Sequence, residues 1–295
     1  MKKNNHVKRN ARYSVGIDIG GTHIRTALYG KGSARPLRTF EINTPKTKTK
    51  FLAALNVLVA TLAGKKKLAG IGVGMRGTVD AKRGILKEDN KLPFLNGWRV
   101  EYSFKKWHIP VAIENDARCF TLAEARYGAG RGYKNIVGVT IGTGIGSGII
   151  VNGVLDTGNH GGAGEIGKMV IELGNPSTHS IASGSSREIR GTTGLRVKTF
   201  EQLAAKRAFQ KLGDRSKIIG IGLANIINTL DPDVIILGGA GGLNKNVHLT
   251  TVKKIANAHV KPALRNKTRI VKGKLGEFAQ CLGATLLLPG SEIAS

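Results

Sequence analysis

Two hexapeptides far apart in the chain repeat each other, and this repeat limits the folds that the chain can adopt. Residues 15–20 read Val-Gly-Ile-Asp-Ile-Gly, and residues 137–142 read Val-Gly-Val-Thr-Ile-Gly. Each is followed by small residues and a second β-rich run, so the spans 13–29 and 136–151 predict two β-hairpins with glycines at their turns. A hairpin that occurs twice predicts a duplicated fold.

The segments after the two hairpins follow a similar order. The first half continues with a third strand, a helix and an apolar strand that ends in glycines, and the second half with two helices and a similar strand. These elements are expected at residues 37–42, 51–63 and 68–75, and at residues 200–212, 217–230 and 233–239. The pattern predicts two similar α/β domains that face each other across a cleft.

A strand that runs into a helix joins the two halves at residues 111–127. Asn115 or Asp116 is expected to cap the start of this helix, and Gly128 follows its end. The sequence therefore predicts a carboxylate at the mouth of the cleft.

The domain boundary is expected at this junction. We assign residues 1–116 to a small N-terminal domain and residues 117–275 to a larger C-terminal domain. A last helix within residues 276–295 ends before Pro289 and is expected to pack back on the first domain.

Composition limits the class of protein further. Of 295 residues, 41% are apolar and 22% charged, which is typical of a globular chain. No run approaches the ~18 apolar residues of a membrane span, and the first residues lack a signal-peptide core, so we expect a cytoplasmic protein without membrane contact. Cys119 and Cys281 are too few for a disulfide framework or a thiolate metal site, and both are expected to be buried or inert.

The net charge of +27 comes from 46 Lys and Arg against 19 Asp and Glu. A basic surface can bind nucleic acid, attract an anionic substrate, or reflect a lineage that favours lysine. The basic residues are dispersed and no nucleic-acid motif surrounds them, so nucleic acid is the least favoured partner.

The turns of both hairpins are candidate phosphate sites. Because they lack side-chain bulk, their backbone N–H groups can approach phosphate oxygens directly. One glycine hairpin is usually only a hairpin, but two matched copies on opposing halves favour an anion site. The residues are Gly20, Gly21, Thr22, Gly142, Thr143 and Gly144.

Asp18 lies inside an otherwise apolar strand, just before the first glycine turn. A buried carboxylate is costly without a partner. A Mg²⁺ ion held through water and shared with nucleotide phosphates is one explanation, and hydrogen bonds from loop amides are the other. The matching residue of the second hairpin is Thr140, so only the first hairpin keeps the charge.

Two further carboxylates are candidates for chemistry. Asp116 is the candidate general base, although its position also suits a helix cap. Glu165 lies in the glycine-rich loop 161–167, which we expect to be flexible. There it can accept hydrogen bonds from a sugar or another polyol, or be a solvated loop acid.

Five motifs carry a resemblance to a known family. They are Asp18-Ile-Gly-Gly-Thr22, Glu114-Asn-Asp-Ala117, Gly142-Thr-Gly-Ile-Gly146, Ala163-Gly-Glu-Ile-Gly167 and Ile236-Leu-Gly-Gly239. In this order and spacing, from about residue 13 to its end, the chain resembles the ROK family of sugar kinases and repressors, within the actin-like ATPase superfamily.

This resemblance implies a duplicated actin-like (RNase H-like) α/β fold, with ATP and a sugar bound between two domains, and a homodimer. In such kinases the aspartate that matches Asp116 accepts the proton of the sugar hydroxyl as this attacks the γ-phosphate, with Mg²⁺ as cofactor. The implied contacts are phosphate at residues 20–22 and 142–144, adenine at Gly239 and Ala240, and sugar at Asn115, Asp116 and Glu165.

Three positions depart from the family pattern. Lys168 replaces a histidine that touches the sugar and ligates zinc, and the cysteine cluster usual within residues 169–181 is missing, so no structural zinc is expected. His179 replaces a second sugar-binding glutamate, and Arg76 stands where a Pro-Gly is typical. Lys168 can only donate hydrogen bonds and His179 can donate or accept, so both substrate-binding positions can shift sugar preference.

The leading interpretation is an ATP- and Mg²⁺-dependent hexose kinase of the glucokinase type. A glucokinase that uses polyphosphate is an alternative, since such enzymes also lack the zinc cluster and a charge of +27 suits a polyanionic donor. A catalytically silent ROK-type sugar sensor is the alternative from another class. ROK repressors carry an N-terminal helix-turn-helix, and only about a dozen residues precede Tyr13, so DNA-binding repression is not expected.

Overall fold

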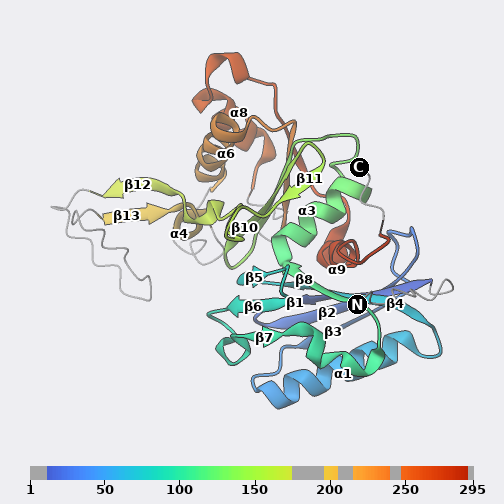
Figure 1. Ribbon diagram of the computed structural model, residues 1–295. Helices are drawn as coiled ribbons and strands as arrows, with labels where there is room; N and C mark the ends of the chain where they lie inside the picture. The colour runs from blue at the N-terminus through green and yellow to red at the C-terminus, as the bar shows by residue number, and fades with distance from the viewer. Residues whose placement is uncertain (1–11, 175–195, 205–214, 240–246, 292–295) are drawn as a thin grey trace.

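The computed structural model describes residues 12–174, 196–204, 215–239 and 247–291. These residues form two five-stranded β-sheets and two smaller sheets. Helices α3 (Asp116–Tyr127) and α9 (Ala279–Thr285) lie between the two large sheets (Figure 1).

The first sheet has the strand order β3-β2-β1-β4-β8. β1 (Tyr13–Ile19), β2 (His23–Gly30) and β3 (Arg38–Asn43) are antiparallel neighbours, and β4 (Leu68–Met75) and β8 (Val111–Asn115) continue the sheet in parallel. The central strands β1 and β4 are buried over most of their length, as expected for strands covered on both faces. Helix α1 (Lys48–Ala63) packs on the face opposite α9 through Phe51, Leu55, Val59 and Leu62, whose spacing places them on one side of the helix (Figure 1).

The second sheet repeats this arrangement strand for strand, in the order β11-β10-β9-β14-β15. β9 (Ile136–Ile141), β10 (Ile145–Val151) and β11 (Val154–Asp156) are antiparallel, and β14 (Val234–Gly238) and β15 (Arg269–Lys272) are parallel to β9. Helices α4 (Phe200–Ala204), α6 (Ser216–Leu230) and α8 (Leu249–His259) share its core. The repetition confirms the predicted duplicated α/β fold.

Glycines allow helix α9 to pack closely against strands β1 and β4 and against helix α3. A Cβ atom on Gly16 of β1 or on Gly72 of β4 would lie 1.9 Å from the carbonyl oxygen of Cys281 or Ala284 in α9, respectively. A Cβ atom on Gly283 of α9 would lie 1.7 Å from the carbonyl oxygen of Cys119 in α3. These glycines are therefore required by backbone-to-backbone contact.

Several short elements were not anticipated from the sequence. β5 (Thr78–Asp80), β6 (Ile85–Glu88) and β7 (Trp98–Arg99) form a three-stranded sheet, and β12 (Val170–Gly174) pairs with β13 (Arg196–Thr199). Trp98 packs edge-on against Phe51 of α1, so the three-stranded sheet closes the first core. The short helices are η1 (Pro93–Leu95), α2 (Val100–Ser103), η2 (Lys105–Trp107), η3 (Ile166–Lys168), η5 (Pro262–Leu264) and η6 (Gly276–Phe278).

The predicted elements agree with the structure in kind and nearly in length. Both hairpins, the helix at 51–63 and the strand-to-helix junction at 111–127 are present, as are the helix at 217–230 and the apolar strands of both halves. The helix predicted at 200–212 is described only over Phe200–Ala204, because the rest lies outside the described residues. Cys119 and Cys281 are both buried, as predicted. Within the described part of the chain, no helix has the length and apolar character needed to cross a membrane.

Candidate active site

Three parallel strands end side by side at one edge of the first sheet. The register places Ile19 of β1 beside Met75 of β4, and Met75 beside Asn115 of β8. The segments that follow these strands therefore meet at the same edge, where parallel sheets bind their ligands. They are the glycine turn 20–22, the Arg76-Gly77 loop and the start of α3.

The first glycine turn presents free N–H groups. Its carbonyls are occupied, because Gly20 accepts from Thr44 Oγ1 at 2.8 Å, Gly21 from Lys46 Nζ at 3.0 Å, and Thr22 from the Thr44 amide at 2.8 Å. Within the described residues, no group accepts from the N–H of Gly21 or Thr22. A turn with bonded carbonyls and open amides is suited to hold an anion.

The second glycine turn has the same character. The Gly142 amide donates to the Gly144 carbonyl at 2.8 Å, and across the described ranges the amides of Thr143 and Gly144 have no acceptor. Gly239 directly follows β14, next to this turn, with a φ of 74°, and a Cβ atom there would lie 2.6 Å from the Ile141 carbonyl oxygen. Ala240, predicted to border the adenine, lies outside the described residues.

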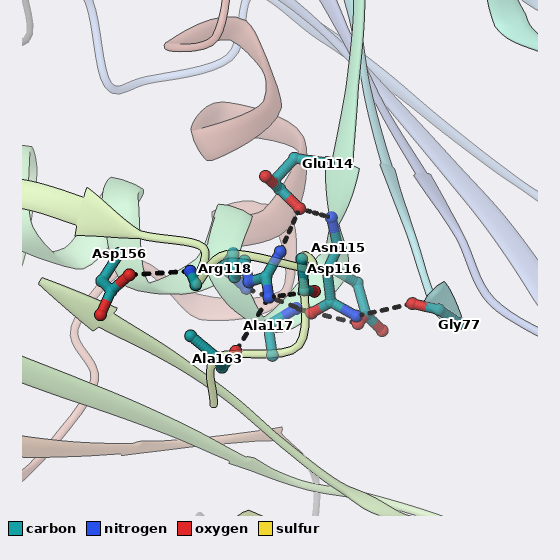
Figure 2. A network of polar contacts seen from close by, with 10 residues as sticks. Gly77, Glu114, Asn115, Asp116, Ala117, Arg118, Asp156 and Ala163 are labelled. Atoms are coloured by element: carbon teal, nitrogen blue, oxygen red, sulfur yellow. Dashed lines mark hydrogen bonds and ion pairs between the residues drawn. The ribbon is translucent and has the colours of Figure 1, made fainter. Parts of the chain in front are cut away.

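Asn115 and Asp116 open helix α3 at the sheet edge. Asn115 is the N-cap, and its Oδ1 accepts from the amides of Ala117 and Arg118 at 2.9 and 3.4 Å. Its Nδ2 donates to the Gly77 carbonyl at 3.2 Å, which ties the helix to the loop after β4 (Figure 2). Asp116 Oδ1 also accepts from the Ala117 amide at 2.8 Å, so among the described residues it is Oδ2 of this carboxylate that is available for other chemistry.

Burial raises the pKa of Asp116 above its ordinary value, while the Ala117 amide and the charge of Arg76 oppose the rise. A raised carboxylate pKa brings a group closer to the range in which it works as a general base.

Asp18 lies one residue before the end of β1, near the same edge, and is 8% exposed. Burial, followed by the neighbouring charge of Asp116, raises the pKa of Asp18 from 3.8 to about 7, although Arg25 acts in the opposite direction. The two carboxylates are thus close enough to repel each other, which is an environment that favours a cation between them or beside them.

A buried ion pair connects this edge to the glycine-rich loop of the second half (Figure 2). Arg118 Nη1 lies 3.0 Å from Glu114 Oε1, and the side chains are 4% and 2% exposed. Arg118 Nη2 donates to the carbonyls of Gly161 and Ala163 at 2.7 and 2.8 Å. Arg118 therefore places the loop that carries Glu165 over the first turn of α3.

Sequence reasoning did not identify Arg118 as part of the site. The signal that could have found it is the i, i+4 spacing of an acid and a base across the end of a strand and the start of a helix. Loop 161–167 was expected to be flexible, but in the structure it is hydrogen-bonded to its surroundings. In addition to the two bonds from Arg118, Ser147 Oγ donates to the Gly164 carbonyl at 2.6 Å. The loop is held at three of its carbonyls.

The structure brings only some of the predicted sugar-binding residues to the sheet edge. Glu165 is exposed at the start of η3, and Lys168 Nζ lies 2.9 Å from Glu201 Oε2. Glu201 also lies against Gly144, so Lys168 is drawn toward the second glycine turn. His179 lies outside the described residues.

The duplicated sheets, the matched glycine turns and the carboxylates at the shared edge define an actin-like two-domain ATPase fold. The chain belongs to the ROK family, which it matches over residues 14–291.

The proteins to which the chain is similar include sugar kinases and repressors. The chain is 30% identical to the N-acetylgalactosamine kinase AgaK of Shewanella sp. (strain ANA-3), over 91% of this chain and 93% of the relative. It is 27% identical to the xylose repressor of Bacillus spizizenii, over 95% of this chain and 78% of the repressor. The structure of a ROK family glucokinase from Streptomyces griseus, in complex with glucose and AMPPNP, matches with a TM-score of 0.76 and 24% identity, over 94% of this chain and 99% of that one.

Proposed function

We propose that the protein is an ATP- and Mg²⁺-dependent hexose kinase of the glucokinase type. The observation that carries the proposal is the juxtaposition of Asp116, a partly buried carboxylate in the first turn of α3, with a glycine turn in which the amides of Gly21 and Thr22 are open. Similarity to sugar kinases such as AgaK supports it. Phosphoryl transfer depends mainly on positioning and charge neutralisation, which this edge can provide.

In this mechanism the two glycine turns hold the donor phosphates through their open amides, and Gly239 with Ala240 borders the adenine. Asn115, Glu165, Lys168 and His179 bind sugar hydroxyls. Asp116 accepts the proton of the hydroxyl that attacks the γ-phosphate, so that the oxygen gains nucleophilic character as the new bond forms.

The donor set at Asp18 fits Mg²⁺. The ion usually binds through one or two carboxylates, several waters and substrate phosphates, and Asp18 is a buried carboxylate next to a phosphate turn. When bound, Mg²⁺ would neutralise charge on the transferring phosphates. Asp18 would hold it through water.

We propose that the two halves of the chain form two domains of different size. Residues 1–116, with the helix within 276–295, would act as the small domain and residues 117–275 as the large one, with the ligands between them and two copies forming a homodimer.

The test is an assay of ADP release with Mg²⁺ and ATP across glucose, mannose, fructose, N-acetylglucosamine and N-acetylmannosamine. We expect turnover on at least one sugar, and Asp116→Asn should lower kcat about 10²- to 10⁴-fold, the usual contribution of a general base. Asp231→Asn is the matched control, because Asp231 is exposed at the end of α6, away from the sheet edge. An unchanged rate for Asp116→Asn would remove this residue from the mechanism.

The similarity to a xylose repressor favours one second candidate, a sugar sensor without turnover. The pairing of Lys168 with Glu201 agrees with it, since the amine is not free in this structure. Sugar binding without phosphate transfer from any donor would identify the sensor. A polyphosphate-using kinase would instead transfer phosphate from polyphosphate, with binding that weakens strongly as salt rises.

A further inference from the structure

Arg76 is a charged side chain at the centre of the candidate site that the proposed mechanism leaves without a role. It follows β4 directly, at the same sheet edge as Asp18 and Asp116. Its side chain is 33% exposed, so it belongs neither to the core nor to the open surface.

The guanidinium group of Arg76 forms an ion pair with the buried carboxylate of Asp89. Arg76 Nε lies 2.8 Å from Asp89 Oδ2, and the Asp89 side chain is fully buried. Asp89 Oδ1 accepts from the amides of Lys91 and Leu92 at 2.6 and 2.7 Å, so this carboxylate is fixed by its own turn. The ion pair engages the Nε side of Arg76, so the two terminal nitrogens are the part of the guanidinium that is left for another partner.

One terminal nitrogen of Arg76 lies beside the first glycine turn. A Cβ atom built on Gly21 would lie 3.4 Å from Arg76 Nη1, which places the guanidinium beside the first glycine turn. Its charge also reaches Asp116, where it opposes the rise in pKa. Among the residues that the structure describes, neither Nη1 nor Nη2 donates a hydrogen bond to the protein.

The other cations near this turn are placed differently. Lys46 Nζ donates to the Gly21 carbonyl, so its charge is used on the carbonyl side of the turn. Lys91 contacts the Gly21 position with its Cβ and Cγ atoms. Among the described residues, Arg76 places a terminal nitrogen beside the Gly21 position, and its charge also acts on the candidate base Asp116.

We propose that Arg76 is a catalytic residue that binds the transferring phosphoryl group and neutralises the charge that develops on it. The proposal rests on the proposed kinase function, because that group must lie between the phosphate turn and the base. The bond from the γ-phosphorus to the ADP oxygen breaks as the bond from the sugar oxygen to phosphorus forms. The hydroxyl proton passes to Asp116, and Arg76 stays protonated throughout.

The experiment compares Arg76→Gln, the double variant Arg76→Gln/Asp89→Asn, and Arg83→Gln. The double variant avoids a buried, unpaired carboxylate, and its new carboxamide keeps an oxygen for the amides of Lys91 and Leu92. Arg83 is the matched control for charge, because its side chain is 77% exposed on the neighbouring turn. Turnover and the affinities for ADP and AMP-PNP are measured for each.

We expect both Arg76 variants to lose about 10²- to 10³-fold in kcat, with the sugar KM nearly unchanged. They should also lose about tenfold or more in affinity for AMP-PNP but keep their affinity for ADP, because only the former has a γ-phosphate. Arg83→Gln should match the wild type in every measurement.

A folded double variant with wild-type kcat, or an equal loss of ADP and AMP-PNP binding, would overturn the role of Arg76. If the wild type transfers phosphate to no sugar, the proposed kinase function is wrong, and the comparison of the two nucleotides still decides whether Arg76 reads the γ-phosphate. If the wild type binds neither nucleotide, both proposals fall.

Discussion

Replacing Asp18 by Asn should stabilise the protein at high pH while it removes the candidate metal contact. The folded pKa of Asp18 is about 7, against an ordinary value of 3.8. A raised carboxylate pKa means that its contribution to stability is fully present below the ordinary value and is lost as pH rises through the folded pKa.

The size of this effect follows from the pKa values. From pH 5 to the folded pKa of about 7, the wild type loses about 3 kcal/mol of stability through Asp18, at ~1.36 kcal/mol per pKa unit. Asn has no such dependence, so the stability of Asp18→Asn relative to the wild type should rise by this amount between pH 5 and pH 8. This corresponds to about 5 to 10 °C in relative Tm for a chain of this size.

The assay is thermal denaturation at pH 5 and pH 8 in EDTA, without nucleotide, so that no cation compensates the carboxylate. Asp80→Asn serves as the control, because Asp80 lies at a turn of the small sheet and pairs with the exposed side chains of Arg83 and Lys87. A difference between Asp18→Asn and the wild type that is the same at both pH values would refute the reasoning. So would a variant that gains stability at pH 5 but not at pH 8.

Three other changes test the packing around the site. Arg118→Met should lower stability by about 3–5 kcal/mol, because it leaves Glu114 buried without its cation, and calorimetry should show weaker sugar binding. Gly283→Ala should lower Tm markedly, since its methyl group would overlap the Cys119 carbonyl, and overpacking usually costs about 1–3 kcal/mol or more. Glu201→Gln should change stability by less than about 1 kcal/mol, because the Lys168 partner is exposed, yet it should alter the sugar KM in steady-state kinetics.

The repeat in the sequence predicted the hairpins and the apolar central strands of both large sheets, because a strand pattern and its turn are local signals. It did not predict the strands β11 and β15 or helix α8. The same kind of signal, a polar residue between a strand and a helix, limited the cap to Asn115 or Asp116, and the structure identifies Asn115. The candidate phosphate- and sugar-binding residues could be named from the sequence. Their individual roles could not, because these depend on which loops lie next to one another in the fold.

The features that escaped prediction are contacts between distant segments. Arg118 reaches carbonyls more than forty positions away, at Gly161 and Ala163. The approach of Arg76 to Gly21 depends on the register of β1 against β4, and the small sheet β5–β7 depends on a surface that α1 offers only after it has packed. None of these contacts produces a periodic pattern or a bias in composition that could be recognised in the sequence.

The packing of α9 has a consequence for the order in which the chain can fold during synthesis. Strands β1 and β4 leave the ribosome early, but the helix whose carbonyls rest on their glycines is made after every strand of the second sheet. Domains generally fold as they emerge, yet here one face of the first sheet stays uncovered until the second half exists. The late helix therefore delays completion of the sheet edge that carries Asp18 and Asp116 until both halves are present, so a partly made chain would not display a finished site.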